Sequence, residues 1–139
     1  MDVLLVEDSP GDVRLAQEAF DASDKPIRLH VVGDGVEAMA FLKHEGAHKN
    51  APRPNLILLD LNLPIVDGRE VLACIKKDAS LCTIPTIVLT ASDAKEDVLF
   101  CYNNHANCFV RKPDQWDAFA SVVRHMNTFW LFMAELPPS

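Results

Sequence analysis

The chain has 139 residues, of which 49% are hydrophobic and 24% are charged, and these values fit one globular domain spanning residues 1–139. Thirteen Lys and Arg residues against 20 Asp and Glu residues give a formal net charge of -7, which argues against nucleic acid as a direct partner. The apolar runs are too short to cross a bilayer and no signal segment opens the chain, so we expect no membrane association and a cytoplasmic location.

Strands and helices alternate along the first half of the chain. The apolar run at residues 3–6 is typical of a buried strand, and residues 9–12 supply helix-start chemistry for the apolar positions that recur up to Phe20. Residues 27–32 are predicted to form a second strand, and residues 33–35 turn the chain into a second helix. This half therefore has the order strand, helix, strand, helix.

The second half continues this alternation after a polar loop at residues 44–54. A third buried strand at residues 56–59 ends at Asp60, and Asp67-Gly68 is expected to be a turn and cap before the next helix. A fourth strand at residues 86–90 precedes a helix that begins at Ser92-Asp93. A fifth strand at residues 108–110 ends shortly before Lys112.

Five short strands that alternate with helices predict an α/β fold with a doubly wound parallel sheet and helices on both faces. Ligand sites of such sheets lie at the carboxyl ends of the strands. One rim should therefore carry five chemically capable side chains, which are Glu7, Asp8, Asp60, Thr90 and Lys112.

Three carboxylates in one small cleft repel each other unless a cation lies between them, and Mg²⁺ prefers oxygen ligands. We expect Asp8 and Asp60 to hold Mg²⁺, with Glu7 behind them and the backbone carbonyl of Asn62 as a further ligand. Lys112 adds a positive charge and Thr90 adds a hydroxyl, and both groups suit the binding of a phosphoryl group.

An aspartate carboxylate can itself form an acyl phosphate, and Asp60 is the central candidate for this role. Lys112 and Thr90 are the expected catalytic partners. We expect Thr90 to close on the phosphoryl oxygens and to vacate space into which the ring of Phe109 rotates. Phosphorylation would then change the shape of the protein surface.

These residues resemble the receiver domains of two-component response regulators over nearly the whole chain. The resemblance is carried by Leu-Leu-Val-Glu7-Asp8, Leu-Leu-Asp60-Leu-Asn-Leu-Pro-x-x-Asp-Gly, Leu-Thr90-Ala and Arg-Lys112-Pro113. It implies a flavodoxin-like sheet of strand order 2-1-3-4-5, with Asp60 as phosphoacceptor, Asp8 as a direct metal ligand and Glu7 acting through water. It also implies switch roles for Thr90, Lys112 and Phe109, and a cis bond before Pro113. Phe109 stands where many members carry tyrosine, so the hydroxyl is missing.

A narrower resemblance connects the chain to small stand-alone regulators of bacterial and cyanobacterial phytochrome kinases. It is carried by residues 7–15, by His105-Ala106-Asn107-Cys108, and by Phe129-Trp130-Leu131 ahead of Leu136-Pro137-Pro138. This resemblance implies that a sensor histidine kinase of phytochrome type is the phosphodonor.

The last predicted helix, residues 116–133, carries more apolar surface than one sheet face can bury. A seam with a 3.5-residue period is accompanied by a second apolar row. We expect an extended C-terminal helix that pairs two copies as a homodimer, together with surface from the fourth helix and fifth strand. Its expected interface residues are Val122, Met126, Phe129, Trp130 and Met133. Alternatively, the outer row folds back under Pro137-Pro138. Residues 128–139 are expected to be a helical extension and tail, with no output domain.

Other functions compete with that of a phosphorylation switch that signals by association. The chain could be a relay intermediate, a phosphate sink, or a receiver unrelated to phytochrome. A phosphohydrolase with an aspartate nucleophile needs a second aspartate two positions later, and Asn62 stands there, so we expect no enzyme. A binding module without phosphorylation is disfavoured by the five rim residues. The five histidines lack ligand spacing, and the four cysteines lack a Cys-x-x-Cys pair and are expected to be reduced and mostly buried.

Overall fold

The computed structural model describes residues 1–138 and confirms the predicted α/β architecture. All strand pairs are parallel, and the sheet has the order β2-β1-β3-β4-β5. The elements in chain order are β1 (Asp2–Val6), α1 (Pro10–Asp21), β2 (Arg28–Val32), α2 (Gly35–Lys43), η1 (Gly46–His48), β3 (Leu56–Leu59), α3 (Gly68–Lys77), β4 (Thr86–Thr90), α4 (Lys95–Asn103), β5 (Cys108–Arg111), α5 (Trp116–Asn127) and η2 (Thr128–Met133).

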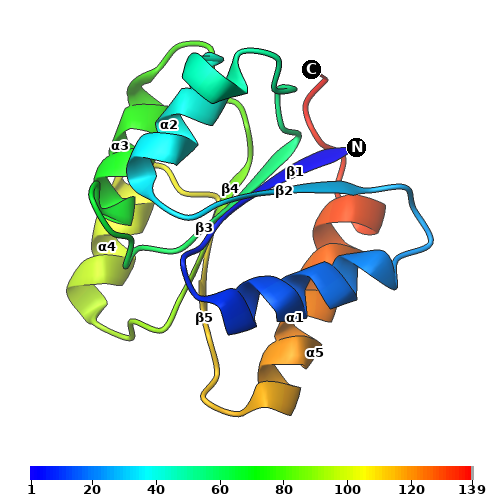
Figure 1. The fold of residues 1–139 in the computed structure, drawn as a ribbon. Helices are drawn as coiled ribbons and strands as arrows, with labels where there is room; N and C mark the ends of the chain where they lie inside the picture. The colour runs from blue at the N-terminus through cyan, green and yellow to red at the C-terminus, as the bar shows by residue number, and fades with distance from the viewer. Residues whose placement is uncertain (139) are drawn as a thin grey trace.

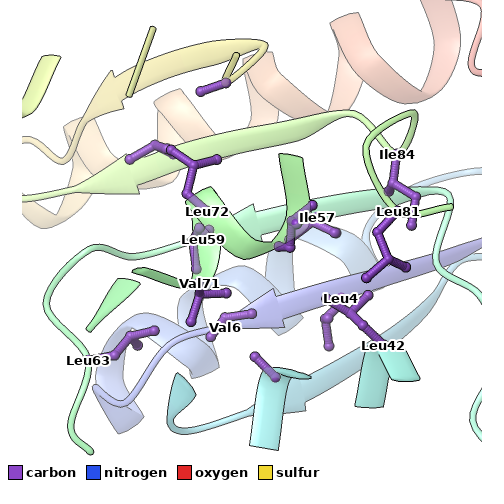
Figure 2. Close-up of a cluster of buried hydrophobic side chains, with 14 of the residues drawn as sticks. Leu4, Val6, Leu42, Ile57, Leu59, Leu63, Val71, Leu72, Leu81 and Ile84 are labelled. Atoms are coloured by element: carbon purple, nitrogen blue, oxygen red, sulfur yellow. The ribbon is translucent and has the colours of Figure 1, made fainter. Parts of the chain in front are cut away.

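Two apolar clusters fix the helices on opposite faces of the sheet (Figure 1). On one face, Leu4, Ile57 and Leu59 of the central strands pack against α2, α3 and α4, as Figure 2 shows for the cluster around Leu72. On the other face, Leu58 and its neighbours pack against α1 and α5. β1, β3 and β4 are buried on both faces, and their sequences are apolar except for Asp2, Thr86 and Thr90 at strand ends.

Side-chain caps fix the beginnings of three helices. The Ser9 hydroxyl accepts a hydrogen bond from the N–H of Asp12, and the carboxylates of Asp34 and Asp67 cap α2 and α3. The predicted structural role of Asp67 as a cap is thereby confirmed.

The predicted start of α4 is wrong. The helix begins at Lys95, because the hydroxyl of Ser92 donates to Asp97 and accepts from the N–H of Ala94 instead of capping a helix at its own position. Leu99 and Tyr102 are exposed, so α4 buries only Cys101. The expectation of mostly buried cysteines is also wrong, since Cys74 is exposed and Cys82 and Cys108 are half-buried.

The last helix extends over the predicted residues 116–133, but its final turns are wound as a π-helix. The π-helical turn changes which residues face the sheet. Phe119, Val123 and Met126 of the predicted seam are buried, whereas Leu131 takes the buried place further on and Met133 is 71% exposed. The seam therefore leaves the core where the π-helix begins.

The C-terminal tail does not cover the outer apolar row of this helix. Pro137 and Pro138 lie in a shallow groove with Pro54, Thr83 and Pro85, at the amino ends of β3 and β4, while Phe129 remains 50% exposed. The alternative in which the tail caps the row is therefore wrong for this structure. Within residues 1–138, no helix is long and apolar enough to span a membrane.

We predict that Ile57→Ala lowers the free energy of unfolding by about 2–5 kcal/mol, because Ile57 is fully buried in the central strand and truncation leaves a cavity. Chemical denaturation followed by circular dichroism measures the change. Val36→Ala, at an exposed position of α2, is the control and should change stability by no more than about 0.5 kcal/mol. Equal losses in the two variants would contradict the assignment of the core.

Candidate functional site

The carboxyl ends of β1 and β3 bring three carboxylates together. Val6 and Leu59 are register partners in neighbouring parallel strands, so Glu7, Asp8 and Asp60 follow them at one edge of the sheet. One oxygen of each carboxylate lies within 4.8 Å of the others. Glu7 and Asp60 are buried and Asp8 is exposed. The site is thus an all-oxygen donor set that is open on one side, which fits a hard divalent cation.

The backbone around Asp60 is fixed by close packing. The N–H of Asp60 donates to the carbonyl of Val6 at 3.0 Å, and the N–H of Asn62 donates to Asp60 Oδ1 at 3.2 Å. A Cβ atom on Gly68 would lie 2.1 Å from the carbonyl oxygen of Asp60. Only glycine therefore allows α3 to begin this close to the backbone of Asp60.

Glu7 orders the loop between β1 and α1. Its Oε2 accepts hydrogen bonds from the N–H groups of Asp8 at 3.1 Å and Ser9 at 3.2 Å, and its Oε1 accepts from Lys112. Burial, together with the neighbouring charge of Asp60, raises the pKa of Glu7 to about 7, although Lys112 opposes this effect. Any further positive charge at the site would therefore stabilise the ionised form of Glu7.

Lys112 supplies the counter-charge from the end of β5. Its Nζ donates to Asp60 Oδ2 at 3.0 Å, to Asp12 Oδ2 at 2.9 Å and to Glu7 Oε1. Burial alone would lower the pKa of Lys112, but the hydrogen bonds to Glu7 and Asp12 raise it above its usual value. The ammonium therefore stays charged and joins three carboxylates that come from two strand ends and one helix.

Asp12 is a member of this site that the sequence analysis did not identify. It lies in the first turn of α1, where an acidic residue is common for helix-dipole reasons alone. The signal available in the sequence was its position, since α1 begins at the same rim of the sheet where β1 ends. The rim thus carries four carboxylates, Glu7, Asp8, Asp12 and Asp60.

The predicted switch residues occupy neighbouring strands. Thr90 is buried at the end of β4, and its carbonyl accepts a hydrogen bond from the N–H of Lys112 at 2.7 Å. Phe109 is the register partner of Val88 and packs at the edge of the cluster around Leu72, so it lies on the same sheet face as Thr90. The Lys112–Pro113 bond is trans, so the expected cis bond is wrong; Lys112 reaches the carboxylates from the trans form.

A second polar network, which the sequence analysis also missed, lies next to Thr90, whose hydroxyl accepts a hydrogen bond of 3.5 Å from the N–H of Ser92. Arg69 donates two hydrogen bonds of 2.7 Å to the carboxylate of Asp97 and further bonds to Asp67. Ser92 donates to the same Asp97 carboxylate, and hydrogen bonds from Arg69 and Ser92 lower the pKa of Asp97 to about 2. This network connects the start of α3 with α4 and with the loop that follows Thr90.

A parallel sheet of order β2-β1-β3-β4-β5, with grouped carboxylates and a lysine at its carboxyl edge, places the chain in the class of flavodoxin-like α/β domains. The model of the response regulator receiver domain matches residues 3–124, so the chain belongs to this family.

Similar proteins include cyanobacterial regulators. Response regulator Rcp1 of Synechocystis sp. (strain ATCC 27184 / PCC 6803 / Kazusa) is 47% identical over 135 residues, which are 97% of this chain and 92% of Rcp1. The crystal structure of the Mn²⁺-bound form of Rcp1 superimposes with a TM-score of 0.97 over 99% of both chains at 47% identity. The phosphorylated cyanobacterial phytochrome response regulator RcpA gives a TM-score of 0.96 at 47% identity, over 99% of this chain and 98% of RcpA.

We predict that Lys112→Met lowers the free energy of unfolding by about 3 kcal/mol at pH 8 without divalent cations, because buried carboxylates lose their counter-charge. The loss should be smaller at pH 5. The pKa of Glu7 is raised to about 7, so Glu7 is protonated at pH 5 and one repelling charge is gone. Millimolar Mg²⁺ should restore part of the stability at pH 8.

Denaturant unfolding at both pH values measures this effect. Lys43→Met, at an exposed position near the end of α2, serves as the control and should change stability by no more than about 0.5 kcal/mol. An unchanged unfolding free energy for Lys112→Met at pH 8 would show that the ammonium does not balance the carboxylates.

Proposed function

We propose that the chain is a phosphorylation-activated response regulator of a two-component system, in which Asp60 accepts a phosphoryl group from a sensor histidine kinase. The observation that carries this proposal is the placement of the Lys112 ammonium against Asp60, Glu7 and Asp12 at an open, all-oxygen rim. The likeness to the phytochrome response regulator RcpA supports a kinase of phytochrome type and hence a light-signalling pathway, for which we propose a cytoplasmic location.

Phosphoryl transfer at this site exchanges one bond for another. A carboxylate oxygen of Asp60 attacks phosphorus in the phosphohistidine of the kinase, and a P–O bond forms while the P–N bond breaks. The imidazole nitrogen keeps the electron pair and takes a proton from solvent. Lys112 stabilises the charge that the phosphoryl oxygens bring to the rim, and its positive charge limits the repulsion by Glu7 and Asp12.

Mg²⁺ is the proposed cofactor. Asp8 and Asp60 would hold it directly, Glu7 through water, and the carbonyl of Asn62 would complete the protein ligands. When bound, Mg²⁺ would neutralise charge on the transferring phosphoryl oxygens. The grouping of the three carboxylates within 4.8 Å and the Mn²⁺-bound form of Rcp1 support a divalent cation here.

The proposed response to phosphorylation runs through Thr90, Lys112 and Phe109. Thr90 carries a buried hydroxyl next to the peptide group that binds Lys112, and Phe109 lies on the same face one strand away. A phosphoryl group on Asp60 would attract the hydroxyl and the ammonium, so that β5 and α4 change shape. The chain would not act as a hydrolase, because Asn62 cannot serve as a general acid.

Signalling by association is favoured over a role as phosphate sink or relay by an exposed apolar surface. We define the β5–η2 patch as the residues Cys108, Val110, Val122, Met126, Phe129 and Trp130, which line one open groove. Met126 in this lining is buried, whereas the rings of Phe129 and Trp130 contact each other edge to face with their centroids 5.3 Å apart. Since β5 is also an edge strand, a twofold homodimer through this patch is the simplest use of the surface.

We predict that Asp60→Asn abolishes the acid-labile phosphate that the chain gains from an autophosphorylated phytochrome-type kinase, because the amide cannot form an acyl phosphate. Incubation with a panel of such kinases, [γ-³²P]ATP and Mg²⁺ in darkness and in light measures the label. Asp67→Asn is the control, since this carboxylate in the same loop binds Arg69 instead of Lys112. Undiminished labelling of Asp60→Asn would show that another residue is the acceptor.

We predict that Trp130→Asp weakens self-association by at least about tenfold, because the new charge would be desolvated in an apolar interface. Sedimentation equilibrium over a concentration series measures the dissociation constant. Phe132→Asp is the matched control, because Phe132 lies in a different groove, with its ring centroid 5.0 Å from Nζ of Lys25. A monomer mass at every concentration of the unsubstituted chain would rule out the dimer.

A further inference from the structure

A groove lies between the end of α1 and the junction of α5 with η2, and α1 and α5 run side by side there (Figure 1). Its volume of about 440 Å³ is in the range of small-molecule sites. Neither the acidic rim nor the β5–η2 patch includes the residues of this groove. Its lining includes Ala19, Ala22, Arg124, Asn127, Thr128 and Phe132.

Asn127 in the wall of this groove carries a polar group without a partner. The residue is 6% exposed, and its buried Nδ2 forms no hydrogen bond with any of residues 1–138. The neighbouring hydroxyl does not relieve it, since Thr128 donates its hydroxyl to the carbonyl of Arg124 at 3.0 Å. A buried donor without an acceptor is costly and rare in native proteins. The amide of Asn127 therefore needs an acceptor oxygen from outside the chain, and the groove leads to it.

The backbone that follows Asn127 is also unusual. Thr128–Met133 is wound as a π-helix, a rare conformation that is frequently found at functional sites. Lys25 fixes this turn against the end of α1, because its Nζ donates to the carbonyl of Leu131 at 2.6 Å and lies 5.0 Å from the ring centroid of Phe132. Phe132 is still 45% exposed. The ring thus forms an apolar wall that the chain leaves partly uncovered.

The charges around the groove favour an anion. Arg124 lines the groove and Lys25 lies beside its aromatic wall, whereas Asp24 is the one acidic residue in the lining. Glu18 borders an adjoining hollow that Arg124 also lines, but it forms an ion pair with Arg14 at 3.4 Å. The groove is therefore locally positive on a chain whose formal net charge is -7. Carboxylate oxygens accept hydrogen bonds from both a guanidinium and an amide N–H.

We propose that this groove binds an amphipathic monocarboxylate of the medium-chain fatty acid class. The carboxylate would accept hydrogen bonds from Nδ2 of Asn127 and from the guanidinium of Arg124. The hydrocarbon tail would cover the ring of Phe132 and the methyl groups of Ala19 and Ala22. One ligand of this chemistry supplies an acceptor for the unpaired amide and apolar cover for the exposed ring.

The test uses octanoate as the probe and the full chain as the protein. Two-dimensional NMR of uniformly ¹⁵N-labelled protein follows the titration through the backbone amides and through the side-chain NH₂ of Asn127. Octanol has the same length without the charge, and acetate has the charge without the tail. We expect a saturable shift that is centred on Asn127 and Arg124, and we expect octanoate to bind at least about tenfold more tightly than octanol or acetate.

Three variants separate binding from folding. Asn127→Leu keeps the size of the side chain and should weaken octanoate binding by about tenfold, and its Tm should equal or exceed that of the unsubstituted chain because the unpaired donor is gone. Arg124→Gln should weaken octanoate binding by about fivefold and change octanol binding by less than about twofold. Asn103→Leu, at an exposed position at the end of α4, is the matched control and should leave octanoate binding within about twofold.

Other results overturn the proposal. Equal affinity for octanoate and octanol would remove the role of the carboxylate, and the lack of a saturable shift at Asn127 would remove the site. A nuclear Overhauser contact from the NH₂ of Asn127 to water that octanoate does not abolish would identify water as the missing partner. Groove signals that shift with protein concentration alone would show that a second copy fills the groove. If Asn127→Leu does not fold, unchanged octanoate affinity in Arg124→Gln overturns the proposal by itself.

Discussion

The rest of the site depends on the ion pairs that the ammonium of Lys112 forms with three carboxylates. It lies between Glu7, Asp12 and Asp60, and it is the charge that lets these carboxylates share one rim. The same residue is bound through its backbone N–H to the carbonyl of Thr90. In the proposed response, a change in the charge of Asp60 would therefore act on β4 and β5 through the single side chain of Lys112.

The two apolar clusters determine which parts of the molecule can respond. The central strands are buried on both faces and well packed, so they provide a rigid floor. The proposed response to phosphorylation would then be confined to the loops at the carboxyl rim, to the edge strand β5 and to α4, which buries little apolar surface. Arg69 and Asp97 hold α4 by charged hydrogen bonds, which reorganise more easily than a packed core.

Sequence patterns correctly predicted the features that depend on the local order of residues and on burial. The bounds of β3 and β4 were predicted correctly because both strands contain an apolar run, which is typical of buried parallel strands. The strand ends then placed Glu7, Asp8, Asp60 and Lys112 at one rim. Features made by tertiary contact were missed. Arg69 and Asp97 are 28 positions apart and meet only in the folded chain, and Ser92 does not cap α4 because Asp97 takes its hydroxyl. Likewise, nothing in Pro64-Ile65-Val66 indicates that Ile65 has a positive φ.

The course of the last helix separates two surfaces of the molecule. Trp116 at its start lies beside Gly11 near the acidic rim, whereas the carbonyl of Leu131 near its end accepts from Lys25, beyond the far end of α1 (Figure 1). Phe129 and Trp130 therefore lie toward the amino edge of the sheet. In the proposed dimer, a second copy at this surface would leave Asp60 accessible, so the proposed kinase could phosphorylate both copies without dissociating them.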